Sequence, residues 1–147
     1  MIKKIGIVLL SVFFLSAGGS AFAVTPDEIR EAMDDRGYTA EIDGNIVYVM
    51  SEHAPIAIAV NGSDGDVSYL TYLRDVTSDT LGYEFLNTFN NEVKFGRAYI
   101  DSDGDIAIQM DRNSTGGVSL DNVMSDIEVF TMLITKFRTD LDRQVSV

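Results

Sequence analysis

The sequence predicts an α+β fold, in which an antiparallel β-sheet is covered by helices in the order α-β-β-β-β-α-β-β-α. Four β-rich runs separated by turn residues occupy residues 38–74, and a hairpin pattern occupies residues 94–112. Apolar residues recur at helical spacing before, between and after these strands. No internal repeat or low-complexity linker interrupts this order, so we expect one domain over residues 24–147.

The first 23 residues have the layout of a secretory signal peptide. Lys3 and Lys4 precede an apolar run at residues 5–15, and residues 21–23 form an A-x-A cleavage site. The apolar run is shorter than the roughly 20 residues that span a bilayer. We therefore expect a cleaved leader over residues 1–23, a periplasmic or secreted mature domain, and no stable membrane anchoring after cleavage.

The mature chain is expected to begin with a short helix and to continue with four strands. Thr25 and Glu28 can form a capping box around Pro26 at the first helical position, and Gly37 supplies the stop. The strands are expected at residues 38–42, 46–51, 56–61 and 67–74. The second and third runs are apolar on both faces, which predicts central, buried strands, whereas the loosely alternating fourth run predicts an outer strand.

Two further helices are expected on either side of the hairpin. Ser78 or Asp79 can begin the first of them, which Gly82 weakens. The final helix, capped by Ser119, has the strongest periodicity in the chain. Its apolar positions, spaced by four and three residues, are Val123, Ile127, Phe130, Ile134, Phe137 and Leu141. A stripe of this kind packs along a hydrophobic core.

The register of the hairpin follows from the alternation of its side chains. A three-residue loop at residues 102–104, with its glycine left-handed, places Asp101 opposite Asp105 and Ile100 opposite Ile106. One face of the hairpin is then made entirely of apolar or small residues, which a two-residue turn would not achieve. We therefore predict the three-residue loop, with two carboxylates as direct cross-strand neighbours.

The other face of the hairpin carries Phe95, Arg97 and Tyr99. Aromatic and arginine side chains are enriched where proteins bind one another, so we predict that these three residues form part of a partner surface. The competing interpretation is that Arg97 simply pairs with a neighbouring acid such as Asp111 at the sheet surface.

Asp101, Asp103 and Asp105 also suggest a cation-binding loop. An EF-hand loop that begins at Asp101 would need glycine at its sixth position and glutamate at its twelfth, where this chain has Ile106 and Arg112. Aspartate is a preferred turn residue, which favours a solvated turn. A divalent-cation site at these three aspartates is kept as the alternative.

Composition excludes several classes of function. Without the leader the chain carries 9 basic and 23 acidic side chains, a formal charge of −14. This charge repels phosphate backbones, so we expect no nucleic-acid partner. The absence of cysteine excludes thiol catalysis and Cys-ligated zinc. His53, the single histidine, accompanies no nucleophile-elbow or HExxH motif, so we expect a surface histidine, no enzyme activity, no catalytic residues and no cofactor.

The segment at residues 85–137 resembles the YbjN family of small bacterial proteins. The features that carry the resemblance are Asn90 after an aromatic-containing helix, the F-G-R-A-Y strand at 95–99, the D-G-D turn at 103–105, the Gly-Gly-Val link at 116–118 and the long final helix. Family members commonly have tryptophan before the asparagine, and this chain has Phe89 there.

The resemblance implies a fold similar to type III secretion chaperones, which bind other chains and often form dimers. Family members are described as sensory transduction regulators, which implies neither a reaction nor active-site residues. We therefore expect a non-enzymatic, exported protein-binding or regulatory module in a bacterium, with an unidentified protein or peptide partner or a second copy of itself. The alternative is a divalent-cation-responsive protein.

Overall fold

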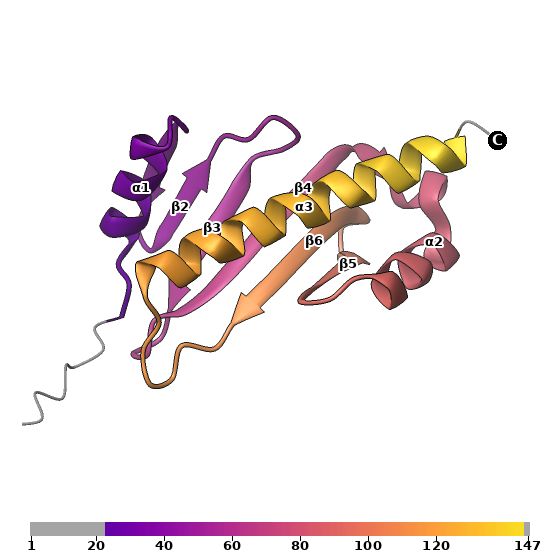
Figure 1. The fold of residues 1–147 in the computed structure, drawn as a ribbon. Helices are drawn as coiled ribbons and strands as arrows, with labels where there is room; N and C mark the ends of the chain where they lie inside the picture. The colour runs from indigo at the N-terminus through magenta and orange to yellow at the C-terminus, as the bar shows by residue number, and fades with distance from the viewer. Residues whose placement is uncertain (1–22, 146–147) are drawn as a thin grey trace, which may run out of the picture.

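The structure, a computed structural model, describes residues 23–145, and apart from Ala23 the predicted leader lies outside the described residues. The elements within this range follow the predicted order. They are α1 (Pro26–Asp35), β1 (Ala40–Asp43), β2 (Ile46–Val49), β3 (Ile56–Asn61), β4 (Asp66–Thr77), α2 (Ser78–Glu92), β5 (Gly96–Ile100), β6 (Asp105–Arg112) and α3 (Leu120–Val145). In Figure 1, α3 runs diagonally across the sheet.

The strands form one antiparallel sheet in the order β1-β2-β3-β4-β6-β5. β4 therefore lies at the centre between β3 and β6, and the expectation that residues 67–74 form an outer strand is wrong. The loose alternation of β4 has a structural cause. Val67, Tyr69 and Leu73 are buried beneath α3, whereas the apolar Leu70 and Tyr72 point to the other face.

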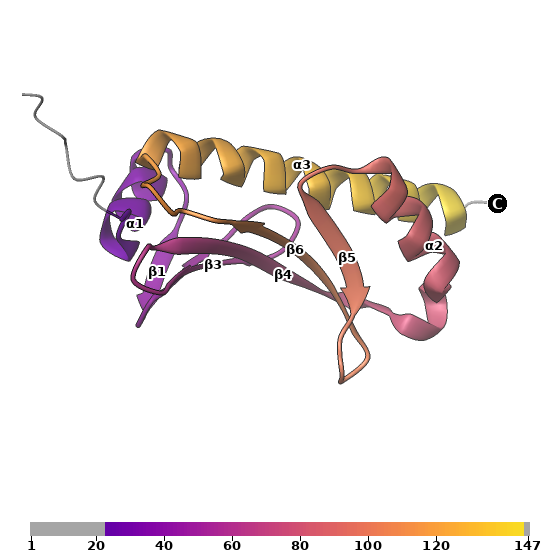
Figure 2. The same ribbon diagram turned by 90° about the horizontal axis from the view of Figure 1, so that it is seen from below.

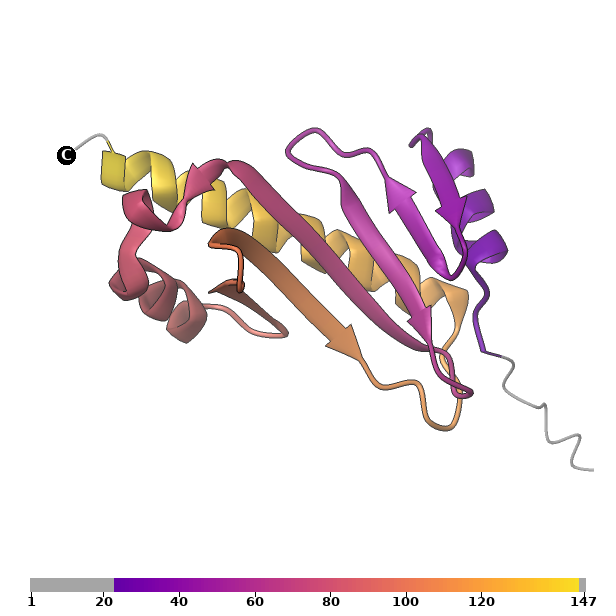
Figure 3. The same cartoon turned by 180° about the vertical axis from the view of Figure 1, so that it is seen from behind.

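The helices leave one face of this sheet uncovered. α3 lies along one face, with α1 and α2 beside its two ends (Figure 2). Seen from behind, the strands lie in front of α3 and no described helix covers them (Figure 3). The expectation that residues 46–51 and 56–61 are buried on both faces is therefore wrong. Tyr48, for example, is 39% exposed.

The core forms between α3 and the covered face, as the helical stripe predicts. Val123, Ile127, Phe130, Ile134 and Phe137 are all buried, and Leu141 is half-buried against them. Burial of one side chain of this size contributes roughly 1.5–3 kcal/mol. The ring of Phe130 lies 6.0 Å from that of Tyr69, and Phe137 meets Phe85 and Phe89 edge-on at 5.2 and 5.1 Å. Together these contacts fix α3 on the sheet.

The predicted helix ends are confirmed. The Glu28 N–H donates to Thr25 Oγ1 at 3.3 Å, and the Thr25 N–H donates to Glu28 Oε2 at 2.8 Å, which completes the capping box of α1. Gly37 follows this helix with φ +82°. Ser119 Oγ accepts the Asn122 N–H at 3.2 Å and caps α3. Gly82, with φ 64° and ψ 158°, kinks α2.

The β5–β6 hairpin has the predicted register. Ile100 pairs with Ile106, and the Asp101 N–H donates to the Asp105 carbonyl at 3.0 Å. Gly104 is left-handed with φ 89°, as the three-residue loop requires. Within residues 23–145, no helix is long and apolar enough to cross a membrane.

Candidate functional site

The uncovered sheet face carries apolar side chains from neighbouring strands. We call it the open face and define it by Ile46, Tyr48, Ala57, Ala59, Leu70, Tyr72, Tyr99 and Ala107, which share this side in the strand register. β1 and the tip of the β5–β6 hairpin bend away from α3 at the two ends of the sheet, so the sheet is curved with the open face on its inner side (Figure 2). Exposed apolar side chains gathered on one face are typical of interaction sites.

Several aromatic side chains on the open face remain accessible. Tyr48 and Tyr72 are each 39% exposed, and Met50, just beyond β2, is 57% exposed. Tyr72 and Tyr99 both pair with Ala107, so the two rings flank this fully buried alanine. Partial burial, with a smaller contribution from Tyr72, raises the pKa of Tyr99. Tyr72 and Tyr99 thus lie on either side of Ala107 on one face, and Ala57 and Leu70 lie between them and Tyr48 in the strand register.

Arg97 lies at one end of the open face and is held along the sheet. Its Nη2 donates to Gln109 Oε1 at 3.1 Å and lies 4.0 Å from an Asp111 carboxylate oxygen. Its guanidinium carbon is 5.7 Å from the centre of the Tyr99 ring. The predicted pairing with Asp111 is therefore present, but the Arg97 side chain remains 60% exposed. This position is compatible both with a place in a partner surface and with a surface ion pair to Asp111.

Phe95 lies on the opposite side of the sheet from Arg97 and Tyr99. Its φ of 70° is the only positive φ at a described residue other than glycine, and β5 begins one residue later. At Gly96, a Cβ would lie 2.5 Å from Leu133 Cδ1, so α3 approaches the backbone directly there. The left-handed turn before this contact breaks the alternation, and the prediction that Phe95 shares a face with Arg97 and Tyr99 is wrong.

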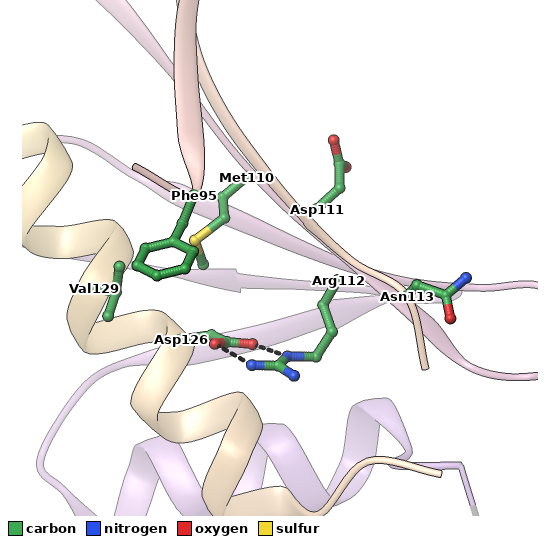
Figure 4. Close-up of a pocket in the computed structure, with 7 residues that line it drawn as sticks. All are labelled: Phe95, Met110, Asp111, Arg112, Asn113, Asp126 and Val129. Atoms are coloured by element: carbon green, nitrogen blue, oxygen red, sulfur yellow. Dashed lines mark hydrogen bonds and ion pairs between the residues drawn. The ribbon is translucent and has the colours of Figure 1, made fainter. Parts of the chain in front are cut away.

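Phe95 instead lines a pocket of about 450 Å³ between β6 and α3. Figure 4 shows its ring beside Met110 and Val129, with Arg112 and Asp126 forming the far wall. Phe95 itself is 77% exposed. A bulky residue held in the left-handed region with most of its ring in solvent is a strained arrangement, which is common at functional sites. The pocket offers an apolar wall and a polar wall to an entering side chain.

The polar wall of this pocket is an internally satisfied ion pair. Arg112 donates to Asp126 through Nε, and through Nη2 at 2.6 Å, and Tyr69 donates to Asp126 at 3.2 Å. The hydrogen bond to Asp126 raises the pKa of Arg112, and burial, followed by the Asp126 charge, raises the pKa of Tyr69 far above its usual value. Arg112 and Tyr69 therefore both keep their protons at neutral pH, so these two side chains can position a ligand but are poorly suited to proton transfer.

The acidic turn at residues 101–105 is held by its own backbone. Asp101 Oδ1 accepts the N–H groups of Asp103 and Asp105, each at 2.9 Å. These two donors offset the repulsion between the cross-strand carboxylates. No three acidic or histidine side chains among the described residues are arranged to hold a metal ion. The cation-binding alternative therefore stays a prediction without geometric support.

His53 lies exposed in the loop between β2 and β3, as expected. The nearby Ser51 hydroxyl donates to the Ala54 carbonyl at 2.5 Å, which closes the turn before β3. This bond commits the serine proton to the backbone rather than to the imidazole. Among the described residues, the recorded hydrogen bonds of Ser51 go to Ala54 and none joins it to His53.

Asn90, at the end of α2, has a role that sequence reasoning missed. Its amide Nδ2 donates to the Ala98 carbonyl at 2.9 Å, and its Oδ1 accepts the Ala98 N–H at 2.8 Å. Ala98 lies on β5, the edge strand, so one side chain replaces a neighbouring strand at this position. The available signal was an asparagine directly after the buried Phe89, at the end of the helix.

Comparisons with known proteins agree with this fold. The family model described as "YbjN: Putative bacterial sensory transduction regulator" matches residues 25–143. The chain is also similar to a solved structure described as "Crystal structure of YbjN, a putative transcription regulator from E. coli", with a TM-score of 0.65 and 12% identity over 85% of this chain and 96% of that chain. No curated protein matches the chain.

At 12% identity, the likeness to the solved structure shows the fold alone. The family model covers most of the chain, from the capping residue of α1 to the last turns of α3. The match includes the Asn90 edge contact, the β5–β6 hairpin and α3, which are the features that organise the open face and the pocket. The chain belongs to the YbjN family.

Proposed function

We propose that the mature domain is an exported, non-enzymatic regulator that binds a polypeptide partner on its open face. The observation that carries the proposal is the uncovered apolar face of the sheet, on which Tyr48 and Tyr72 are each 39% exposed. Contiguous apolar surface costs free energy in water, and it marks interaction sites in soluble proteins. Tyrosine supplies a large contact area together with a hydroxyl that can bond to a partner backbone.

Charge indicates the chemistry of the partner. Glu41, Asp43 and Asp111 lie in the same strand register as the tyrosines and are exposed at the margins of the open face. The chain without residues 1–23 carries a formal charge of −14. A segment with apolar side chains and flanking lysine or arginine complements this surface, whereas a second copy of the same acidic chain would be repelled.

Regulation through protein contact also suits the family description. The E. coli relative is described as a transcription regulator. A DNA-binding surface needs basic side chains that neutralise phosphates, and this chain has the opposite balance of charge. The regulatory role that we propose is therefore binding of a protein in the periplasm or outside the cell. The pattern that supports export is the signal-peptide layout of residues 1–23.

The test compares two matched variants of the mature domain. Tyr48→Ser with Tyr72→Ser removes aromatic area from the open face, and Tyr83→Ser with Met132→Ser removes exposed apolar side chains on α2 and α3. Wild type and both variants are cross-linked in envelope extract, and each enriched protein is then purified and titrated against them. Thermal unfolding first establishes that both variants are folded.

The proposal expects a partner that binds wild type and the helix variant but loses at least about tenfold in affinity for the open-face variant, which corresponds to about 1.4 kcal/mol. The affinity should also fall as salt rises, since the partner is expected to be basic. Equal binding to both variants contradicts the proposal. A dimer that only the open-face variant loses would identify a second copy as the occupant and overturn the argument from charge.

A further inference from the structure

A polar pocket of about 240 Å³ lies where the chain enters α1. Its lining residues are Ala23, Ser63, Asp64, Ser114, Gly116 and Gly117. They come from the chain before α1, the β3–β4 turn and the β6–α3 link, three segments that lie side by side in Figures 1 and 3. Ala23 is seated on the β3–β4 turn, since its Cβ lies 2.5 Å from the position that a Cβ would take on Gly65. The start of the domain is thus in contact with the two loops.

Among the described residues, the pocket is lined by hydrogen-bond acceptors and by no basic side chain. Ser114 is only 2% exposed, and its Oγ has no hydrogen-bond partner among the described residues. Such a buried hydroxyl costs free energy unless something bonds to it. The Ser114 N–H donates to Asp66 Oδ1 at 2.7 Å, and Thr115 Oγ1 donates to Asp64 Oδ2 at 3.1 Å. Neither carboxylate takes part in an ion pair within the described residues.

The nitrogen of Val24 is held beside this pocket. The Val24 side chain is 5% exposed and belongs to the core, and the capping box fixes Thr25 immediately after it. The Val24 nitrogen is bonded to the Ala23 carbonyl carbon, which lies 3.9 Å from the same position above Gly65. Cleavage after Ala23 would turn this amide nitrogen into an α-ammonium group, whose pKa of about 8 leaves most of it charged at neutral pH.

We infer that the pocket is an acceptor site for the α-ammonium group of Val24, with the Asp64 carboxylate and the Ser114 hydroxyl as its acceptors. The ligand is an alkylammonium that the chain supplies to itself, and the inference rests on the proposed cleavage of residues 1–23. Before cleavage, Ala23 forms part of the pocket wall and the Val24 nitrogen is an uncharged amide. Cleavage would remove Ala23 and leave the new charge at this end of the pocket, next to the loops that carry the proposed acceptors.

The consequence is that processing stabilises the fold. The ammonium group would join the start of the chain to the β3–β4 turn and to the β6–α3 link, which are far apart in the sequence. On α1, Glu28 Oε2 already accepts hydrogen bonds from the N–H and the hydroxyl of Thr25. The exported form is then more stable than the same domain with any residue before Val24.

The test uses three forms of the mature chain, which begin at Val24 with a free amine, at Val24 with an acetylated amine, or at Ala23. Urea unfolding of each form gives the unfolding equilibrium constant. The constant should be about three- to tenfold smaller for the free Val24 form than for the other two, as expected for a charge-assisted hydrogen bond at a partly exposed site. At a fixed pH, the Val24 amine should also react more slowly with an acylating reagent than the α-amine of the form that begins at Ala23.

Two aspartate variants provide the control. Asp64→Asn should abolish the difference between the free and acetylated forms, whereas Asp43→Asn, at the end of β1, should preserve it. Equal stabilities of the free and acetylated forms, or equal behaviour of the two variants, overturn the acceptor site while leaving the proposed function intact. N-terminal sequencing of the exported protein tests the cleavage separately, and a first residue other than Val24 overturns the cleavage together with this assignment.

Discussion

Asn90 closes the free edge of the sheet, and its replacement gives a stringent test of how this domain is stabilised. Asn90→Ala removes both hydrogen bonds to Ala98, at 2.9 and 2.8 Å, without removing an apolar contact from the core. Ala98 is 2% exposed, so its N–H and carbonyl groups have little access to water once the amide is gone. The variant therefore leaves two poorly solvated backbone groups on an edge strand.

The expected cost follows from these two bonds. Leaving a buried donor or acceptor unsatisfied costs about 1–3 kcal/mol. Because Asn90 itself is exposed, water can enter part of the space that its amide vacates, so we expect about 2–3 kcal/mol for the pair rather than the upper limit. With a urea m-value of about 2 kcal/mol/M, the middle of the range for small proteins, the unfolding midpoint should fall by about 1–1.5 M.

The assay is urea unfolding followed by circular dichroism, combined with amide hydrogen exchange at Ala98. Asn91→Ala is the matched control, because Asn91 is an exposed neighbour on the same helix. The Ala98 amide should exchange much faster in Asn90→Ala, and concentrated samples should associate through the exposed edge. If Asn90→Ala shifts the midpoint no more than Asn91→Ala does, the side-chain amide does not stabilise the edge and this reasoning is refuted.

Three further predictions concern other parts of the fold. Gly96→Ala should destabilise the domain by about 1–3 kcal/mol in urea unfolding, because its Cβ would lie 2.5 Å from Leu133 Cδ1, and Leu133→Ala in the same chain should recover part of this loss. Asp101→Ala should cost about 1 kcal/mol by removing the acceptor of two N–H groups. Asp101→Asn should retain most of the stability, and a thermal midpoint that rises with calcium in wild type alone would instead support the cation alternative. The hydrogen bond from Arg138 lowers the pKa of Asp75. The stability that the ionised Asp75 carboxylate gives to the fold is therefore present above its unfolded pKa and is lost as pH falls through its folded pKa. Arg138→Gln should weaken this acid dependence of the thermal midpoint.

Local patterns predicted most of the secondary structure because they report which side of an element faces the core. The capping box at Thr25, the stripe on α3 and the hairpin register around Gly104 all depend on residues close together in the sequence. The same reasoning wrongly predicted that β2 and β3 are buried on both faces, because apolar residues on both faces of a strand indicate apolar surroundings without showing whether a helix supplies them. It also placed β4 at the outside because its alternation is loose, whereas β4 lies at the centre of the sheet. On this sheet, one of the two apolar faces is the open face.

The candidate sites depend on contacts that no local pattern contains. Phe95 leaves the face of Arg97 and Tyr99 because α3 presses on the backbone at the following residue, through Leu133. The bonds of Asp126 to Arg112 and Tyr69 join residues from α3, β6 and β4, and alternation within one strand cannot foresee them. Sequence analysis could find acidic and aromatic residues, but it could not say which of them meet.

The sequence by itself determined the order of the elements, the core face of α3, the register of the hairpin and the acidic charge, since each follows from periodicity or composition. Only the tertiary structure decided the strand order, the absence of a described helix on the open face, the position of Phe95 and the closure of the β5 edge by Asn90. The physical reason is that side-chain alternation is set within a few residues, whereas the face that stays uncovered is set by where distant segments pack.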